Sequence, residues 1–374
     1  MHLVDTTIFF TPQGGGVPRY LRAKHDWLRR NSSIRHTIVA PGMKDQHGEL
    51  EAVRTWPPVA PYGYRFPTHL ARWRKRLVQL KPDLIEVGDP YGPAWAALQA
   101  GQKSGVPVIG FYHSDLVRLV CSRFGRAAGK AAAHYVRQLY SQFDLVLAPS
   151  RYVVDRLQQI GVDDVVRQPL GVDTEVFHPK RRDPKLRRQL GLGEDTRLLI
   201  FAGRFSNEKN VPLLVKAFRK LGSRYHLLLV GGGMRIERQA NVTVRNYQAN
   251  EQKLARLIAS CDALVHAGQQ ETFGLVVLEA MSCGVPVVGV AEGGVAELVG
   301  EHHGVLASKV SSTALAEAIE ALYERDPARM GWDARETVLS QYGWGNVMRS
   351  LLALYRHRVL SSWTAAVREV YACR

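Results

Sequence analysis

The sequence has few cysteines and no long hydrophobic run. Its 374 residues include four cysteines (Cys121, Cys261, Cys283 and Cys373), and no two of them form a C-x-x-C motif. This spacing argues against a zinc site or a disulfide framework and is typical of the reducing cytoplasm. No apolar stretch approaches the ~18 residues that a membrane-spanning helix needs. The first residues, MHLVDTTIFF, lack the basic region and cleavage site of a signal peptide.

Acidic residues are scarce relative to basic ones. Lysine and arginine number 50 against 34 aspartates and glutamates, which gives a formal net charge of +16. Nucleic acid, an anionic membrane surface or an anionic substrate would each account for this excess, and so would an arginine-rich composition with no partner. The basic cluster RWRKR (72–76) shares a helical pattern with Leu70, Trp73 and Leu77. We interpret its charges as a solvated helix face, with contact to a membrane as the alternative.

Short apolar runs alternate with helical patterns along the chain. In the first half, strands are predicted at 3–10, 36–41, 84–89, 106–113 and 145–150, and helices at 17–30, 68–80 and 93–103. In the second half, strands are predicted at 197–203, 226–233, 241–246, 263–268 and 286–291, and helices at 211–221, 250–260 and 274–283. Such alternation is typical of right-handed βαβ units with a parallel sheet.

The alternation divides into two halves. Between them, after PLGVDTEVFHP (169–179), the chain turns polar and charged. We predict an α/β fold with two Rossmann-like domains facing across a cleft, one over 1–175 and one over 176–350. The amphipathic segment 351–374 is predicted to pack back on the first domain. Ligands of open parallel sheets bind at the carboxyl ends of the strands, so the site residues are sought there.

The strongest motif is a pair of glutamates in HAGQQETFGLVVLEAMSCGVPVVG (266–289). Glu271 precedes a predicted helix that begins near Gly274, and the amino end of a helix suits a diphosphate. Glu279 lies within that helix among apolar residues, where a carboxylate needs a partner such as a pair of ribose hydroxyls. The alternative is that both glutamates lie on the surface and one of them caps the helix.

Two further motifs follow other predicted strands. FAGRFSNEKN (201–210) presents Arg204 and Lys209, two cations that could neutralise a diphosphate as it leaves. The alternative is an ordinary basic loop paired with Glu208. GFYHSD ends a strand of the first half with His113, although a lone histidine is more often structural than catalytic.

Taken in chain order, these motifs resemble one family. GGGVPRYL, GFYHSD, PSRYVVDRL, PLGVDTEVFHP, AGRFSNEKN and ETFGLVVLEAMSCGVPVVG resemble retaining glycosyltransferases of the GT-B type, in the nucleotide-sugar group called family four. The resemblance implies transfer of a hexose from a nucleoside-diphosphate sugar to a hydroxyl of a lipid-linked or glycan acceptor. GDP-mannose is the first expected donor and UDP-glucose the second, as in enzymes that build glycolipids or surface glycans.

The resemblance also implies roles for the charged residues. Arg204 and Lys209 correspond to the basic pair that holds the donor diphosphate. Glu271 corresponds to the acid that faces the donor sugar, and Glu279 to the acid that bonds the nucleotide ribose. His113 corresponds to a histidine near the reactive side of the sugar.

The remaining matches are backbone and loop positions. Gly15 and Gly16 match backbone that approaches the diphosphate from the first domain, and Tyr247 lies where the family holds the base. Four residues match the loop around sugar and phosphate: Thr272, Phe273, Gly274 and Leu275. No D-x-D motif occurs, which is consistent with a metal-independent enzyme of this type, and no cofactor is expected.

Alternative functions remain open at this point. A GT-B nucleotide-sugar epimerase would differ in needing no acceptor. A basic α/β protein that binds nucleic acid would explain the charge, but we find no basic groove interleaved with aromatics and no nucleic-acid motif. An NAD enzyme is the weakest candidate, because no G-x-G-x-x-G is followed by an acid about 20 residues later. We expect a cytoplasmic enzyme that contacts the inner face of an anionic membrane and no nucleic acid.

Overall fold

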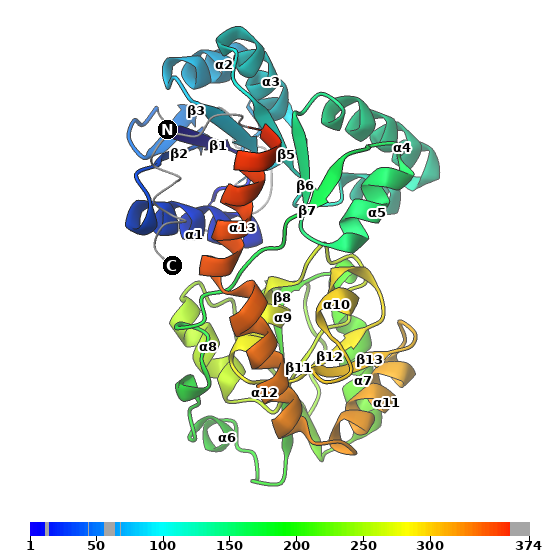
Figure 1. The fold of residues 1–374 in the computed structure, drawn as a ribbon. Helices are drawn as coiled ribbons and strands as arrows, with labels where there is room; N and C mark the ends of the chain where they lie inside the picture. The colour runs from blue at the N-terminus through cyan, green and yellow to red at the C-terminus, as the bar shows by residue number, and fades with distance from the viewer. Residues whose placement is uncertain (12–14, 44, 56–63, 68, 360–374) are drawn as a thin grey trace. The chain divides into compact units, whose positions relative to one another are not determined.

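The structure is a computed structural model that describes residues 1–11, 15–43, 45–55, 64–67 and 69–359 (Figure 1). These residues form two units. The first unit comprises the chain up to Leu170 and the chain from Trp344 onward, and the second comprises Gly171–Gly343. The predicted bounds of the second domain are 176–350. The second unit begins and ends side by side, since Val172 pairs with Gly343 in a parallel bridge.

Within its described residues, the first unit has one parallel sheet of seven strands in the order β3-β2-β1-β4-β5-β6-β7. The strands are β1 His2–Thr6, β2 Arg35–Gly42, β3 Leu50–Arg54, β4 Leu84–Val87, β5 Val108–Phe111, β6 Leu145–Ala148 and β7 Val165–Arg167. The helices are α1 Gly16–Asn31, α2 Leu70–Gln79, α3 Gly92–Ser104, α4 Leu116–Tyr140, α5 Arg151–Gln159 and α13 Trp344–Leu354. The strand order reverses direction at β1 and β4, as in a Rossmann-like sheet.

Helix α2 carries the RWRKR cluster, and its two faces differ in burial. Trp73 and Leu77 are fully buried in the core of the first unit, and Trp73 Nε1 donates to Thr6 Oγ1 at 2.8 Å. Arg72, Arg74 and Lys75 are exposed on the other face. The apolar stripe of this helix is therefore part of the core, and its exposed basic residues lie on the opposite, solvent-accessible face.

A buried group of charged and phenolic side chains, here called the core charge cluster, ties the end of the chain to the first sheet. Its members are Asp5 on β1, Tyr20 and Lys24 on α1, Glu86 on β4, and Tyr355, which begins a π-helical segment Tyr355–Val359 after α13. Lys24 Nζ donates to Asp5 Oδ1 at 2.9 Å and to Tyr355 Oη at 3.0 Å, and lies 3.1 Å from Glu86 Oε1. Tyr20 Oη donates to the same Glu86 oxygen at 2.8 Å. All five residues are at most 1% exposed.

Within its described residues, the second unit has one parallel sheet of six strands in the order β10-β9-β8-β11-β12-β13. The strands are β8 Arg197–Phe205, β9 Tyr225–Gly233, β10 Val242–Asn246, β11 Ala263–Val265, β12 Val287–Val290 and β13 Gly304–Ala307. The helices are α6 Leu186–Gln189, α7 Val211–Leu221, α8 Glu251–Ala259, α9 Leu275–Ser282, α10 Gly293–Leu298, α11 Ser312–Tyr323 and α12 Pro327–Thr337. A 3-10 turn precedes α6 at Pro179–Arg181, and a π-helical segment follows α12 at Val338–Tyr342.

The predicted alternation of strands and helices is confirmed in both units, and several bounds and elements differ from expectation. β1 ends at Thr6, four residues before the predicted 10, although the Thr7 N–H still donates to the Val39 carbonyl. The short strands β3, β7 and β13 were not predicted. The predicted terminal segment 351–374 is described only as far as 359, and α13 packs against α1 of the first unit.

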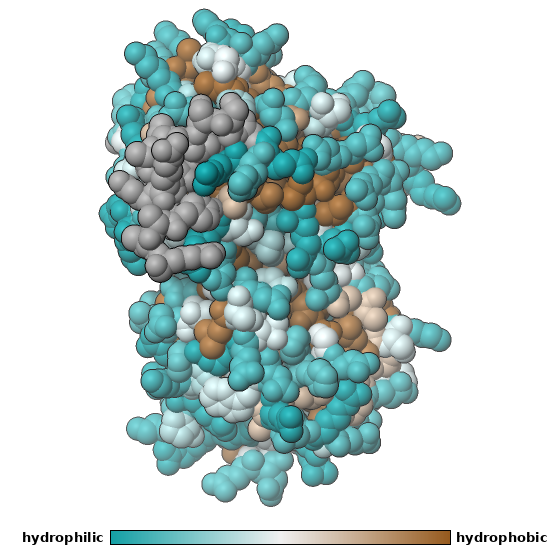
Figure 2. All heavy atoms as spheres, viewed as in Figure 1, coloured by the Kyte–Doolittle hydropathy of each residue, from teal (hydrophilic) through white to brown (hydrophobic). Residues whose placement is uncertain are grey.

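The surface is largely polar. In Figure 2 the viewed face of each unit is mostly hydrophilic, with smaller apolar areas between the charged side chains. Among the helices that the structure describes, none combines the length and the apolar character that crossing a bilayer requires.

Candidate active site

Two loops of the second unit follow neighbouring strands at their carboxyl ends. β8 ends at Phe205 and β11 at Val265, and these strands are adjacent in the sheet. The loop after β8 contains a 3-10 turn, Asn207–Lys209, and the loop after β11 runs to Gly274, the N-cap of α9. Because parallel strands end at the same edge of a sheet, the two motifs singled out in the sequence come together.

An ion pair joins these loops. Lys209 Nζ donates to Glu271 Oε2, and His266 Nε2 lies 3.4 Å from the same oxygen. Burial by itself would raise the pKa of Glu271, but the Lys209 ammonium and the His266 ring lower that pKa well below its usual range. The side chains of Lys209 and Glu271 are 20% and 19% exposed. The pair is therefore ionised and remains within reach of solvent.

His266 was not singled out from the sequence. It follows β11 directly, is 1% exposed, and burial lowers the pKa of its ring, so the ring is neutral. Its Nδ1 has no hydrogen-bond partner among the described residues. A neutral ring that donates to Glu271 must carry its proton on Nε2. Its position at the carboxyl end of a buried strand was the signal that could have identified it.

Arg204 lies near the end of β8 and is more exposed than Lys209. Its Nη2 is 3.2 Å from Glu208 Oε1, and the two side chains are 53% and 34% exposed. The alternative of a basic loop paired with Glu208 thus describes Arg204 but not Lys209, whose partner is Glu271. An exposed pair of this kind is weak and easily exchanged for another anion.

Glycines hold the loop that carries Glu271. Gly274 has φ +103, a left-handed conformation that favours glycine. Gly294, in α10, donates its N–H to the Glu271 carbonyl at 2.7 Å. A Cβ on Gly294 would lie 2.6 Å from the Thr272 carbonyl oxygen and 2.8 Å from Phe273 Cα. The backbone of α10 therefore fixes the position of this loop, a contact that the sequence motif did not reveal.

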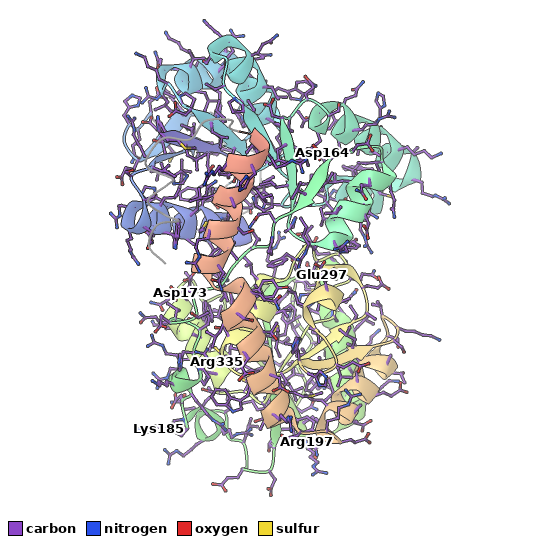
Figure 3. All side chains as sticks on the ribbon, in the orientation of Figure 1. Asp164, Asp173, Lys185, Arg197, Glu297 and Arg335 are labelled. Carbon is purple, nitrogen blue, oxygen red and sulfur yellow. The ribbon has the colours of Figure 1, made fainter. Side chains whose placement is uncertain are left out.

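Helix α9 places the second glutamate in the interior. Glu279 is 3% exposed, so the alternative of two surface glutamates is wrong. Phe273 is 2% exposed and anchors the start of α9, where Leu275 is the first helical residue. The buried Arg335 of α12, labelled in Figure 3, donates Nη1 to the Ser282 carbonyl at the other end of α9. Both ends of this helix are thereby held.

Tyr247 lies directly after β10, the edge strand of the second sheet. Its side chain is 49% exposed, so the phenol is open to solvent rather than packed into the core. The described loop of Thr272 and Gly274 starts from β11, which is separated from β10 in the sheet by β8 and β9. Tyr247 thus lies on the same sheet as the ion pair, but on a different strand.

The other predicted site residues belong to the first unit. His113 follows β5, and its ring stacks on Phe111 with a centroid separation of 4.0 Å. Burial, with the charge of Lys24, lowers the pKa of His113 to about 3. Gly15 is the exposed N-cap of α1 with φ −82, so it needs no left-handed backbone, and a Cβ there would meet nothing within 4 Å. Gly16 begins α1.

Comparison with sequence families and curated proteins identifies relatives for both halves. Residues 182–337 match the family described as Glycosyl transferases group 1, and residues 14–176 match Glycosyltransferase Family 4. A GDP-mannose-dependent alpha-mannosyltransferase of Mycobacterium tuberculosis is 29% identical over 92% of this chain and 94% of its own length. Another protein of that name, from Mycolicibacterium smegmatis, is 32% identical over 73% of each chain.

Solved structures share the fold. Sucrose-phosphate synthase from Thermosynechococcus elongatus superposes with a TM-score of 0.77 at 21% identity, covering 95% of this chain and 98% of that one. Anabaena HepE in complex with UDP-glucose gives a TM-score of 0.75 at 19% identity, covering 94% and 98%. The predicted GT-B fold of two Rossmann-like domains is confirmed. The relatives support a transferase and favour neither an epimerase nor a nucleic-acid-binding protein. The chain belongs to the group 1 glycosyltransferase family.

Proposed function

We propose that the chain transfers mannose from GDP-mannose to a hydroxyl of a lipid-linked or glycan acceptor, with retention at the anomeric carbon. The observation that carries the proposal is the solvent-accessible Lys209–Glu271 pair beside the first residues of α9. The names of the mycobacterial relatives support the choice of GDP-mannose. UDP-glucose is the second candidate donor.

In this proposal the donor diphosphate breaks the ion pair between Lys209 and Glu271. A diphosphate takes the place of Glu271 as the partner of Lys209, and Arg204 turns from Glu208 to the same phosphates. The backbone from Thr272 to Leu275 offers N–H groups at the amino end of α9. Glu271, released from Lys209, accepts hydroxyls of the donor sugar.

The nucleoside lies farther along the same sheet. Glu279 accepts the ribose hydroxyls, which supply polar partners for a carboxylate that is 3% exposed. Tyr247 adjoins the base. The family resemblance assigns the backbone of Gly15 and Gly16, in the first unit, to the diphosphate, and the neutral ring of His113 to the sugar.

The reaction needs charge stabilisation rather than a covalent intermediate. The acceptor oxygen forms the new bond to the anomeric carbon while the bond from that carbon to the phosphate oxygen breaks. The acceptor proton passes to an oxygen of the leaving phosphate. Lys209 and Arg204 stabilise the negative charge that develops there. No metal or cofactor takes part in this scheme.

A donor screen tests the proposal. We expect GDP-mannose to raise the melting temperature of the chain more than UDP-glucose does, because a ligand that binds the folded state stabilises it. Mannose should then appear in an acceptor-dependent product with the α configuration. A larger rise in melting temperature with UDP-glucose, together with transfer of glucose, would show that UDP-glucose is the donor. A product formed without any acceptor would contradict transfer and favour an epimerase.

We propose further that α4 contacts the membrane that carries the acceptor. Phe124 and Leu119 of this helix are 68% and 48% exposed, next to a kink at Gly125 with φ +85. The Arg123 guanidinium lies 5.9 Å from the Phe124 ring, so a cation accompanies the apolar group. Apolar side chains beside arginines suit an anionic lipid surface.

Sedimentation with vesicles tests this contact. Vesicles containing phosphatidylglycerol should carry the chain down at low salt and less at high salt. Phe124→Ser should weaken this binding, whereas Trp332→Ser, at an aromatic 58% exposed in the second unit, should not. Equal sedimentation of the two variants, or no binding at low salt, would contradict the proposal.

A further inference from the structure

The first unit contains a cavity at the amino-terminal edge of its sheet. The cavity has a volume of about 670 Å³ and is lined by residues at the start of β1 and β2 and after α2. Among them are His2, Arg35, His36 and Lys81. His113 follows the carboxyl end of β5, so the cavity lies at the opposite edge of the same parallel sheet. The family motifs and the proposed donor site leave it unassigned.

The cavity has more positive charge than its acidic residues neutralise. Arg76 is paired with Glu51 through Nη2 and Oε2 at 2.7 Å. Arg29 also lines the cavity and approaches Asp26 only to 3.8 Å at an exposed position. The side chains of Arg35 and Lys81 are exposed, and neither forms an ion pair or hydrogen bond with the described residues. Arg35 and Lys81 thus border the cavity without an ion pair to the described residues, and Arg29 adds a third cation with only the 3.8 Å contact to Asp26.

Two histidines in the wall are linked by hydrogen bonds. His36 Nε2 is 2.9 Å from Asp5 Oδ2 and donates to it, because a carboxylate only accepts. Burial lowers the pKa of His36, so its ring is neutral. Its Nδ1 accepts a hydrogen bond from His25 Nδ1 at 3.2 Å. His25 Nε2 faces Glu49 Oε2 at 3.2 Å. These contacts place both histidines in one hydrogen-bonded chain between Asp5 and Glu49.

We propose that this cavity binds a phosphate group, carried either by a small soluble molecule or by a lipid headgroup. Arginine guanidinium groups match the oxygens of a phosphate in pairs, and Lys81 adds a third charge. The volume exceeds that of a bare phosphate and leaves room for an attached sugar or glycerol. The proposal concerns the first unit alone and is independent of the proposed donor and acceptor.

The wall of the cavity continues into the core charge cluster. His36 and Lys24 share Asp5, through oxygens Oδ2 and Oδ1, both at 2.9 Å. Lys24 in turn bonds Tyr355, which follows α13. A phosphate beside Arg35 therefore changes the electrostatic field at residues that hold the end of the described chain to the first sheet. His25 and His36 line the cavity, so their imidazole NMR signals should respond to a phosphate bound there.

A titration with inorganic phosphate tests the site. Imidazole signals of the isotopically labelled full chain are followed by NMR at constant ionic strength, with His25→Gln and His36→Gln to assign them. We expect saturable shifts of the His25 and His36 signals. In Arg35→Gln/Lys81→Asn the apparent Kd should rise at least about tenfold, since each lost cation removes a charge-assisted bond. Asparagine suits position 81 because φ there is +48.

The matched control is Arg30→Gln, an exposed arginine beside Arg29 that does not line the cavity. It should bind phosphate as the unaltered chain does. Shifts that do not saturate, shifts absent from His25 and His36, or equal Kd values for the control and the double variant would overturn the proposal. Because the readout is local to the first unit, phosphate bound near Lys209 does not affect it.

Two further titrations separate the sources of the phosphate. Glucose 1-phosphate represents a soluble ligand, and phosphatidylcholine vesicles containing phosphatidic acid represent a headgroup. Competition with inorganic phosphate by either one supports the proposal and names the source. Failure of both to compete would overturn it, because a phosphate site with room for a substituent must accept at least one.

Discussion

The two units each contain a lysine that neutralises a carboxylate, and the surroundings of the two lysines differ. Lys24 is 1% exposed and all its partners lie within the core charge cluster. Lys209 is 20% exposed and shares Glu271 with one neutral histidine. Burial would raise the pKa of Asp5 and of Glu271, and in both cases the neighbouring lysine lowers it. The two lysines thus act alike on the pKa of the neighbouring carboxyl group, but only Lys209 is accessible to solvent.

This difference distinguishes a structural cluster from a binding site. A buried cluster in which every hydrogen-bond donor has a partner offers no group to a ligand. Removal of one member leaves a buried charge without a partner and lowers the stability of the fold strongly. A partly exposed pair costs little to open, and its lysine can take a phosphate in exchange for the carboxylate. The comparison predicts that Lys24 contributes to stability, and it supports the proposed role of Lys209 in binding the donor phosphates.

The largest expected effect is on stability. Lys24→Met leaves Asp5 and Glu86 buried without a cation, so we expect the free energy of unfolding to fall by about 3–5 kcal/mol. Denaturant titration measures it. Lys75→Met, at an exposed lysine on α2, should change it by less than about 0.5 kcal/mol. Similar losses of unfolding free energy in the two variants would contradict the structural role of Lys24.

Crowding the loop that carries Glu271 should have the next largest effect. Gly294→Ala forces a Cβ to within 2.6 Å of the Thr272 carbonyl oxygen, and we expect a loss of about 1–3 kcal/mol of stability together with reduced turnover. Denaturation and initial rates measure the two effects. Gly232→Ala is the matched control, since its Cβ would meet nothing within 4 Å. An active, stable Gly294→Ala would show that α10 does not position the loop.

Acidification tests the buried histidine of the first unit. The pKa of His113 is about 3 in the folded chain and about 6.5 when unfolded. Between these values the unfolded chain binds one more proton, so the free energy of unfolding falls as pH falls through this window. His113→Gln should make the loss between pH 7 and pH 5 smaller by about 2 kcal/mol. Parallel curves for both proteins would mean that His113 titrates normally.

The smallest expected effect is at the exposed pair. Glu208→Gln removes one ion-pair partner of Arg204, and because both side chains are accessible to solvent we expect stability to change by less than about 1 kcal/mol. Without this competing carboxylate, the guanidinium should bind the donor phosphates more readily and lower the KM for the nucleotide sugar by a few-fold. A large loss of stability would mean that Arg204 stabilises the fold, as Lys24 does, and would contradict its proposed role in donor binding.

The fold was largely predictable because its strands are buried on both faces and read as continuous apolar runs. The strands that were missed are short or peripheral. β7 has three residues, and two of the five residues of the edge strand β3, Glu51 and Arg54, are charged. α4 was missed because Gly125 and several arginines interrupt its apolar pattern.

The candidate site was predictable where its residues stand in one loop or at one end of a strand. Lys209 and Glu271 are 62 residues apart, and they could be brought together because parallel strands end at one edge. Gly294 was not predictable, since its contact with Glu271 depends on how the loop folds back, and the one sequence signal for His266 was its position directly after β11. Lys24 reads as a surface residue, because lysine is seldom buried unless it is paired.

The most direct test of the central claim is the rate of sugar transfer by Lys209→Ala at saturating donor. The account predicts that turnover falls about 100- to 1,000-fold, as for loss of one group that stabilises a developing oxyanion. The melting temperature should stay within a few degrees of that of the unaltered chain, because Lys209 is partly exposed. Near-normal turnover by the folded variant would contradict the assignment of Lys209 to the donor phosphates.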